Sequence, residues 1–139
     1  MINFIFETVD IPNFDNTGIT KWIKKIAAHY GKQIGRINYI FCDDSKILEV
    51  NNQFLNHDYY TDIITFDYSQ GRNIAGDIYI SLDTVASNAL EWAVDYTQEL
   101  DRIIIHGILH LCGQEDKTPE DSAEMTMKEN HALAIRIQK

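Results

Sequence analysis

The sequence predicts an α+β fold, a single domain over residues 1–139 in which helices cover a mixed four-stranded sheet. Strand-like and helix-like segments follow one another in the order β-α-β-α-β-β-α-α-α. The chain has 139 residues and is 45% hydrophobic, values that are typical of one globular domain. No internal repeat, low-complexity segment or linker divides the sequence.

The first half of the chain is predicted to alternate strands and helices. Apolar and polar β-formers alternate over residues 2–7, which predicts a strand. A helix is predicted over residues 18–30, ended by Gly31, with an apolar stripe made of Ile19, Trp22, Ile23, Ile26 and Ala27. A second strand is predicted over residues 36–42. It is followed by a helix over residues 45–55, whose cap is expected among residues 43–45, and by a loop at residues 56–60.

The second half begins with two predicted strands, residues 62–68 and 75–81, joined by a turn at residues 69–73 and expected to form an antiparallel hairpin. Asp83 is expected to cap a helix that runs to about residue 92. A further helix starts at Asp95 or Thr97 and runs to about Cys112. Thr118, Pro119 and the acids that follow predict the start of the last helix, which runs to about residue 137.

The candidate site lies in residues 106–116, which read HGILHLCGQED. His106 and His110 are four residues apart, so a helix places both imidazoles on one face, where they could bind one Zn²⁺. Gly113 is a good helix end because glycine readily adopts the left-handed conformation. A reversal there would bring Asp116 back as a third ligand. Three protein ligands with one open position are typical of a catalytic zinc, here one ion per chain.

The spacing H-x-x-x-H-x-x-G-x-x-D is close to the metzincin protease pattern H-E-x-x-H-x-x-G-x-x-H. Gly107 stands where those proteases have their general-base Glu, and Asp116 stands in place of the third His. A carboxylate can ligate zinc, so the pattern keeps the metal ligands and loses the proteolytic base. Glu115 competes with Asp116 for the third position and is also a candidate catalytic residue near the bound water.

This stretch resembles the YbeY family, bacterial metal-dependent endoribonucleases of rRNA maturation, whose signature is H-G-x-L-H-L-x-G-x-D-H. The residues that match in place are His106, Gly107, Leu109, His110, Leu111 and Gly113, and Asp116 replaces the terminal His. Residues 61–66, TDIITF, look like the family's P-T-D-V-L-S-F segment, and residues 76–78 look like its G-D-I. Leu55 stands where the family pattern has an Arg.

The resemblance implies a zincin-like fold, similar to that of zinc metalloproteases, and a single-strand-specific metallo-endoribonuclease. It further implies a role in 16S rRNA 3′-end maturation and ribosome quality control, with single-stranded rRNA and the ribosome or its proteins as partners. Thr61 and Asp62 are expected near the site for substrate binding, and Asp62 is also a catalytic candidate. Gly76 and Asp77 mark either a functional position or a close backbone approach.

Two other functions stay open from the residues alone. A metzincin-like metallopeptidase would share the metal ligands, and the missing Glu at Gly107 argues against it. A non-catalytic ribosome-assembly factor braced by zinc agrees with Leu55 and with the net charge of −9, since phosphate binding usually leaves a basic surface. Residues 1–36 are the exception, with five basic and three acidic residues.

The remaining features indicate a cytoplasmic protein without a membrane segment. No apolar run approaches the ~18 residues of a membrane span, and the first residues lack the features of a signal peptide. Cys42 and Cys112 are far apart in the sequence and are expected to be reduced thiols, with Cys112 in the core. His29, His57 and His131 are not assigned to the metal.

Overall fold

A computed structural model of the protein describes residues 1–55 and 61–137. The elements follow the predicted order: β1 Ile2–Phe6, α1 Asn16–His29, β2 Gln33–Cys42, α2 Asp44–Leu55, β3 Ile63–Asp67, β4 Asn73–Ser81, α3 Leu82–Glu91, α4 Tyr96–Leu111 and α5 Pro119–Ile137. The α+β fold with its mixed four-stranded sheet is therefore confirmed. The loop predicted at residues 56–60, which includes His57, and the side chain of Leu55 lie outside the described residues.

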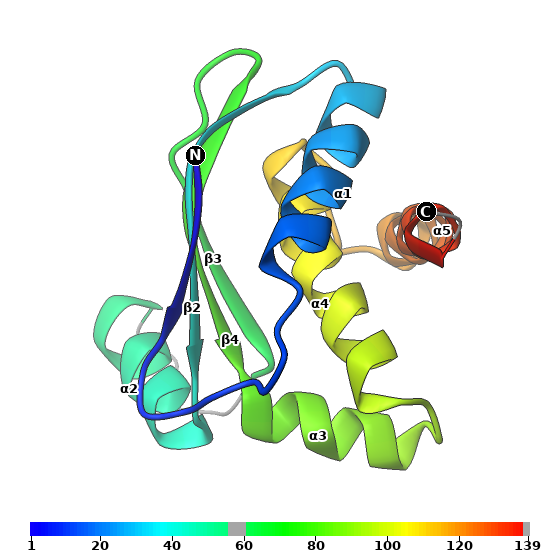
Figure 1. Ribbon diagram of the computed structural model, residues 1–139. Coiled ribbons are helices and arrows are strands. Elements are labelled where there is room, and N and C mark those ends of the chain that lie inside the picture. Colours follow the sequence, from blue (N-terminus) through cyan, green and yellow to red (C-terminus); the bar gives the residue numbers. More distant parts are fainter. Residues whose placement is uncertain (56–60, 138–139) are drawn as a thin grey trace.

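The sheet has the strand order β1-β2-β4-β3. β2 pairs in parallel with both β1 and β4, whereas β3 pairs antiparallel with β4, so the predicted hairpin of the third and fourth strands is confirmed. Figure 1 shows α1 and α4 on one side of the sheet, α2 on the other, and α5 outside α4. No helix in the described part of the chain is long and apolar enough to cross a membrane.

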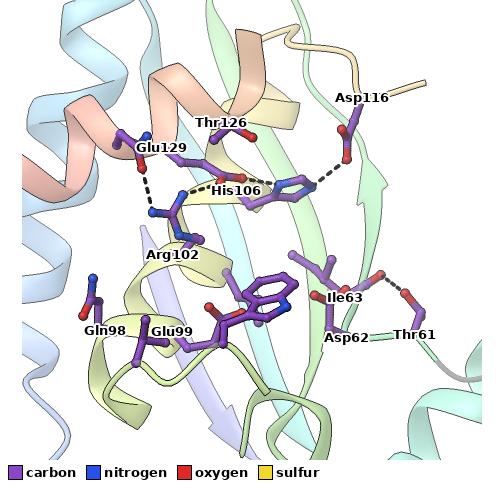
Figure 2. A pocket seen from close by; sticks show the side chains of 14 residues that line it. Thr61, Asp62, Ile63, Gln98, Glu99, Arg102, His106, Asp116, Thr126 and Glu129 are labelled. Carbon is purple, nitrogen blue, oxygen red and sulfur yellow. Dashed lines mark hydrogen bonds and ion pairs between the residues drawn. The ribbon is translucent and has the colours of Figure 1, made fainter. Parts of the chain in front are cut away.

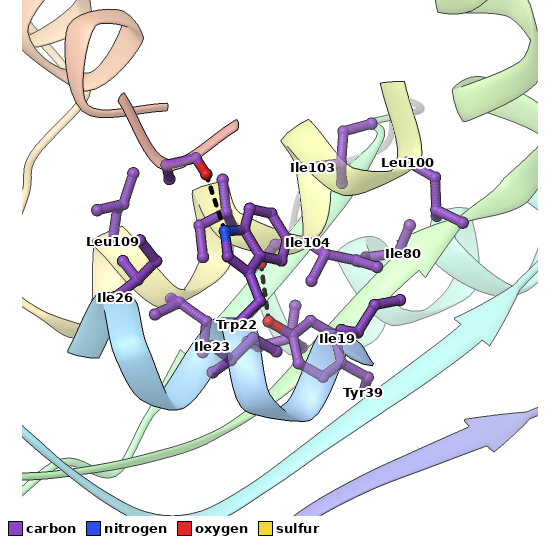
Figure 3. Packing of buried hydrophobic residues seen from close by; sticks show 14 of the residues in the cluster. Ile19, Trp22, Ile23, Ile26, Tyr39, Ile80, Leu100, Ile103, Ile104 and Leu109 are labelled. Atoms are coloured by element: carbon purple, nitrogen blue, oxygen red, sulfur yellow. Dashed lines mark hydrogen bonds between the residues drawn. The ribbon is translucent and has the colours of Figure 1, made fainter. Parts of the chain in front are cut away.

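Helix α4 lies at the centre of the core. Ile104, Ile105 and Ile108 are fully buried between the sheet and the surrounding helices. The polar atoms of two buried aromatic residues are hydrogen-bonded: Tyr39 Oη donates to Ile104 O at 2.7 Å, and Trp22 Nε1 donates to Ala132 O at 2.8 Å (Figure 3). Buried Tyr and Trp generally need such partners. These two bonds tie α4 to β2 and α1 to α5, and they fix the helix that carries both histidines.

Several predicted boundaries differ from the observed ones. β2 and β4 begin earlier than predicted because Gln33 pairs with Asn73, beyond a register shift that lies between Ile34 and Ile37. The prediction that Asp83 caps α3 is wrong. Ser81 is the cap, and its side chain accepts from the N–H of Thr84 at 3.4 Å.

Asp83 instead lies in the first turn of α3 and serves the start of a different helix. Its Oδ2 accepts the backbone N–H of Asp44, the first residue of α2, at 3.0 Å. Asp43 caps α2 as expected, since its Oδ1 accepts from Lys46 N at 2.9 Å. α1 also begins before the predicted residue 18, because Asp15 Oδ1 accepts from Gly18 N at 3.1 Å.

Gly76 is required by a close backbone approach within the hairpin. A Cβ on Gly76 would lie 2.4 Å from the carbonyl oxygen of Phe66 and 3.2 Å from a methyl of Leu111. The neighbouring Asp77 accepts a hydrogen bond from Asn38 Nδ2 at 3.0 Å across the sheet, and neither residue lines the cavity described below. Of the two expectations for this pair, the structure favours the close approach.

Gly76→Ala is expected to destabilise the protein by an amount at or above the upper end of the ~1–3 kcal/mol typical of overpacking, because the clash is with backbone. Denaturant unfolding monitored by circular dichroism measures the loss. Ala28→Ser, at an exposed position of α1, is the control and should stay within ~0.5 kcal/mol of wild type. Equal stability of Gly76→Ala and wild type would contradict the close approach.

Candidate active site

A cavity of about 770 Å³ opens between α4, α5 and the start of β3. α4 contributes Gln98, Glu99, Arg102 and His106 to its wall (Figure 2). These residues are spaced by one, three and four positions, so on a helix they form one polar stripe. The other face of α4 carries the isoleucines of the core. The amphipathic pattern of the helix therefore directs this stripe of polar side chains into the cavity.

His106 is held by a carboxylate from α5. Its Nδ1 lies 2.7 Å from Glu129 Oε2, and Glu129 Oε1 accepts from Arg102 Nη1 at 2.8 Å. Arg102 Nη2 also donates to Asn130 Oδ1 at 2.6 Å. Burial lowers the pKa of His106, but the hydrogen bond to Glu129 and the nearby carboxylates outweigh it, so the pKa lies above its ordinary value. The Glu129 carboxylate thus fixes the orientation of the imidazole.

The other ring nitrogen of His106 faces Asp116, with 3.7 Å between Nε2 and Oδ2. The reversal at Gly113 produces this approach. Gly113 has φ +105°, its N–H donates to His110 O, and the N–H of Gln114 donates to Leu109 O, each at 3.0 Å. These two bonds form a Schellman motif, and the positive φ of Gly113 confirms the helix end expected there.

Buried Gln114 anchors the loop after the helix. Its Nε2 donates to Glu115 O at 2.9 Å and to Asp121 O at 3.3 Å, and its Oε1 accepts from Lys128 Nζ at 2.7 Å. In this register Asp116 lines the cavity, and Glu115 is not among the lining residues.

His106 and Asp116 are placed as two ligands of one metal ion would be, whereas His110, the other predicted ligand, is not gathered with them. Two ligands of one tetrahedral zinc lie roughly 3.4 Å apart, which is close to the His106–Asp116 separation. A ligating His usually gives its second nitrogen to a carboxylate, as His106 does with Glu129. His110 lies one turn further along α4, half-buried and outside the cavity lining. Among residues 1–55 and 61–137, no three His, Cys, Asp or Glu side chains are grouped closely enough to hold a metal.

Thr61 and Asp62 both line the cavity. Asn88 of α3 reaches two carboxylates there: its Nδ2 lies 3.5 Å from Asp62 Oδ2 and 3.4 Å from Glu99 Oε2. Burial raises the pKa of Asp62, and the charge of His106 partly opposes the shift. Burial also raises the pKa of Glu99, which is 3% exposed. The cavity therefore holds two carboxyl groups that take up protons more readily than usual.

Most residues of this site were not singled out from the sequence, among them Asn88, Glu99, Arg102 and Glu129. Glu99 and Arg102 precede His106 by seven and four residues, so helical spacing on an otherwise apolar helix was a usable signal. Asn88 and Glu129 come from other helices, and nothing in their local sequence connects them to His106.

Gly107 faces the sheet and not the cavity. A Cβ there would lie 3.0 Å from Ile78 Cδ1 and 3.4 Å from Ile63 Cδ1. The side chain of a glutamate at position 107 would therefore leave the backbone among isoleucine methyl groups. Cys112 is partly buried against the core, as expected, and burial raises its pKa to about 11. His29 and His131 are exposed and lie beside each other, 5.1 Å between ring centroids.

Comparisons with known proteins agree over nearly the whole chain. A family model described as "Endoribonuclease YbeY" matches residues 4–135. A protein of that name from Phocaeicola vulgatus is 57% identical over 135 residues, covering 97% of this chain and 98% of the relative. A protein of the same name from Bacteroides thetaiotaomicron is 55% identical, and the match again covers 97% of this chain and 98% of the relative. The solution structure of TM1509 from Thermotoga maritima is similar in fold, with a TM-score of 0.70, 27% identity, and coverage of 96% of this chain and 87% of that one.

Proposed function

The chain belongs to the YbeY endoribonuclease family, and from this premise we propose that it is a metal-dependent endoribonuclease that cleaves single-stranded RNA. The observation that carries the proposal is the orientation of His106, with Nδ1 on Glu129 and Nε2 facing Asp116 across 3.7 Å. The finer proposal is cytoplasmic action in 16S rRNA 3′-end maturation and ribosome quality control, with the ribosome or its proteins as partners.

One zinc per chain would be held by His106, His110 and Asp116. When bound, the ion polarises a phosphoryl oxygen and lowers the pKa of a water ligand to ~7. Glu129 would keep the proton of His106 on Nδ1, so that the lone pair of Nε2 would be available to a metal ion. Asp62 is the candidate proton acceptor, because it lines the cavity and burial raises its pKa. Thr61 is proposed to contact the substrate. Glu115, the other catalytic candidate, is supported less because it does not line the cavity.

Two observations favour RNA cleavage over the alternative functions. A peptidase would need a general base next to the first histidine, and position 107 faces the isoleucines of the sheet instead. A zinc that only braced the fold would not need an open cavity of about 770 Å³ lined by Asp62 and Glu99. Both features suit an enzyme that admits a nucleotide.

Asp116 can be tested directly as the third ligand. Asp116→Ala should weaken zinc binding by ~10-fold or more. Even a residue that only hydrogen-bonds to a metal ligand contributes that much to metal affinity. Asp116→His should keep the metal, because histidine is an equally good ligand. Competition with a zinc chelator measures both affinities, and Glu115→Ala is the matched control. Loss of metal in Glu115→Ala with normal binding in Asp116→Ala would reverse the assignment.

The activity is tested by incubating zinc-loaded protein with labelled single-stranded RNA, duplex RNA and casein in parallel. We expect cleavage of the single strand only, abolished by a chelator and by His110→Ala. Because the net charge is −9, cleavage of free oligonucleotides should be slow and should fall further as salt increases. Casein digestion that vanishes in His110→Ala, with RNA left intact, would favour the peptidase instead.

A further inference from the structure

The wall of the cavity contains an exposed indole. Trp92 lines the cavity and is 59% exposed, whereas Trp22, the other tryptophan of the chain, is 4% exposed and buried in the core. Several large hydrophobic side chains of the described residues are exposed, and among them Trp92 alone lines the cavity. In this position the indole offers a flat apolar surface to a molecule that enters the cavity.

The backbone at Trp92 is fixed by a tight helix end. Its N–H donates to Asn88 O at 3.0 Å, and the N–H of Val94 donates to Ala89 O at 3.0 Å. Ala93 between them has φ +53°, a left-handed conformation that costs a non-glycine residue ~1–2 kcal/mol. Asn88, which caps this turn through its carbonyl, also reaches Asp62 and Glu99 with its side chain. The backbone that carries the indole is therefore linked through Asn88 to two carboxylates of the cavity.

We propose that Trp92 is a stacking wall for a base of the RNA substrate, an inference that rests on the proposed function. Base–aromatic stacking contributes ~1–3 kcal/mol per base and works with every base, because each has a π-face. The cavity volume of about 770 Å³ exceeds what a phosphodiester alone would fill and leaves room for a nucleoside. Gln98, also in the wall, offers an amide that can both donate to and accept from a base edge.

Because the charged groups that line the cavity are mainly acidic, stacking on Trp92 would supply affinity that phosphate contacts cannot. Four carboxylates line it, those of Asp62, Glu99, Asp116 and Glu129, against the cation of Arg102 and the imidazole of His106. Such a cavity attracts phosphate weakly before a metal is bound, so an uncharged contact must supply affinity. A base can reach the indole only if it is unstacked from its neighbours, which single strands allow and duplexes do not. Trp92 would thus contribute to single-strand selectivity.

Binding can be observed on Trp92 itself. In a Trp22→Phe background it is the only tryptophan, so its fluorescence reports contact with the ligand. The zinc-loaded protein is titrated with 2′-O-methyl hexa-adenylate and with a matched hexamer of abasic ribose phosphates. Saturable quenching by the adenylate, and none by the abasic hexamer, is expected. Equal quenching by both, or by neither, overturns the stacking proposal.

Cleavage kinetics supply the second measurement. Trp92→Ala should raise KM for single-stranded RNA about 5- to 150-fold with a smaller change in kcat, and Trp92→Phe should recover most of the loss. Leu90→Ala is the matched control, because Leu90 is 85% exposed and outside the cavity lining. An unchanged KM in Trp92→Ala overturns the stacking wall while leaving the ribonuclease intact.

The two proposals fail in different ways. If wild-type protein does not cleave RNA but the adenylate alone quenches Trp92, the proposed function is wrong and the base-binding wall stands. If neither hexamer quenches, while Trp92→Ala and Leu90→Ala both reduce co-sedimentation with ribosomes, the exposed indole contacts a protein partner and the stacking proposal is wrong.

Discussion

His106→Ala and His110→Ala should each lose zinc and reduce RNA cleavage by well over ~100-fold. Removing only a residue that hydrogen-bonds to a metal ligand already lowers metal affinity ~10–100-fold. In the proposed site each imidazole would supply one of only three protein ligands, and two ligands hold zinc poorly at a site that also keeps an open position. Elemental analysis of the purified variants gives the zinc content, and the single-stranded RNA assay gives the activity.

His131→Ala is the matched control because His131 is an exposed histidine on α5. It should keep both the metal and the activity. Full zinc occupancy in the His106→Ala/His110→Ala double variant would refute the ligand assignment. The His110 variant is the more informative of the two, because His106 already faces Asp116 whereas His110 does not line the cavity. Retention of zinc by His110→Ala alone would point to a different third ligand.

The parts of the structure that depend on local sequence are those that could be predicted. The apolar stripe of α1 at residues such as Trp22 and Ile26, and the Gly113 helix end, follow from spacing and backbone preference alone. Boundaries set by contacts between elements could not be predicted. β2 and β4 extend to Gln33 and Asn73 because each supplies the other's pairing partner, and Ser81 caps α3 while Asp83 serves α2.

The residues of the site also divide into those that the local sequence predicts and those that it does not. His106, His110 and Asp116 lie within one helix and the turn after it, so their relation is visible as a spacing. Glu129 lies 23 residues beyond His106 and reaches it only because α5 packs on α4. The same holds for Asn88, which reaches Glu99 through the packing of α3 on α4. Groups that orient or protonate a site from neighbouring helices leave no local pattern, since tertiary packing selects them.

Glu129→Ala is the variant that tests this outer part of the site, and its effect should rank second only to loss of a ligand. The Glu129 side chain is 9% exposed and holds His106 Nδ1 at 2.7 Å and Arg102 Nη1 at 2.8 Å. Removing the carboxylate frees the imidazole to rotate or change tautomer. Zinc affinity should fall by ~10–100-fold and activity with it.

The conservative variant Glu129→Gln separates the effect of the carboxylate on the position of His106 from the effect of the side chain on packing. Glu129→Gln keeps the shape and one acceptor oxygen, so it should lie between wild type and Glu129→Ala in zinc affinity. Glu124→Ala is the control on the same helix, because it removes only a surface pair with Lys128 at 3.3 Å, which contributes little. Chelator competition gives the affinities, and the Nδ1 proton resonance of His106 reports the tautomer. Wild-type affinity and an unchanged resonance in Glu129→Ala would show that the carboxylate does not position His106.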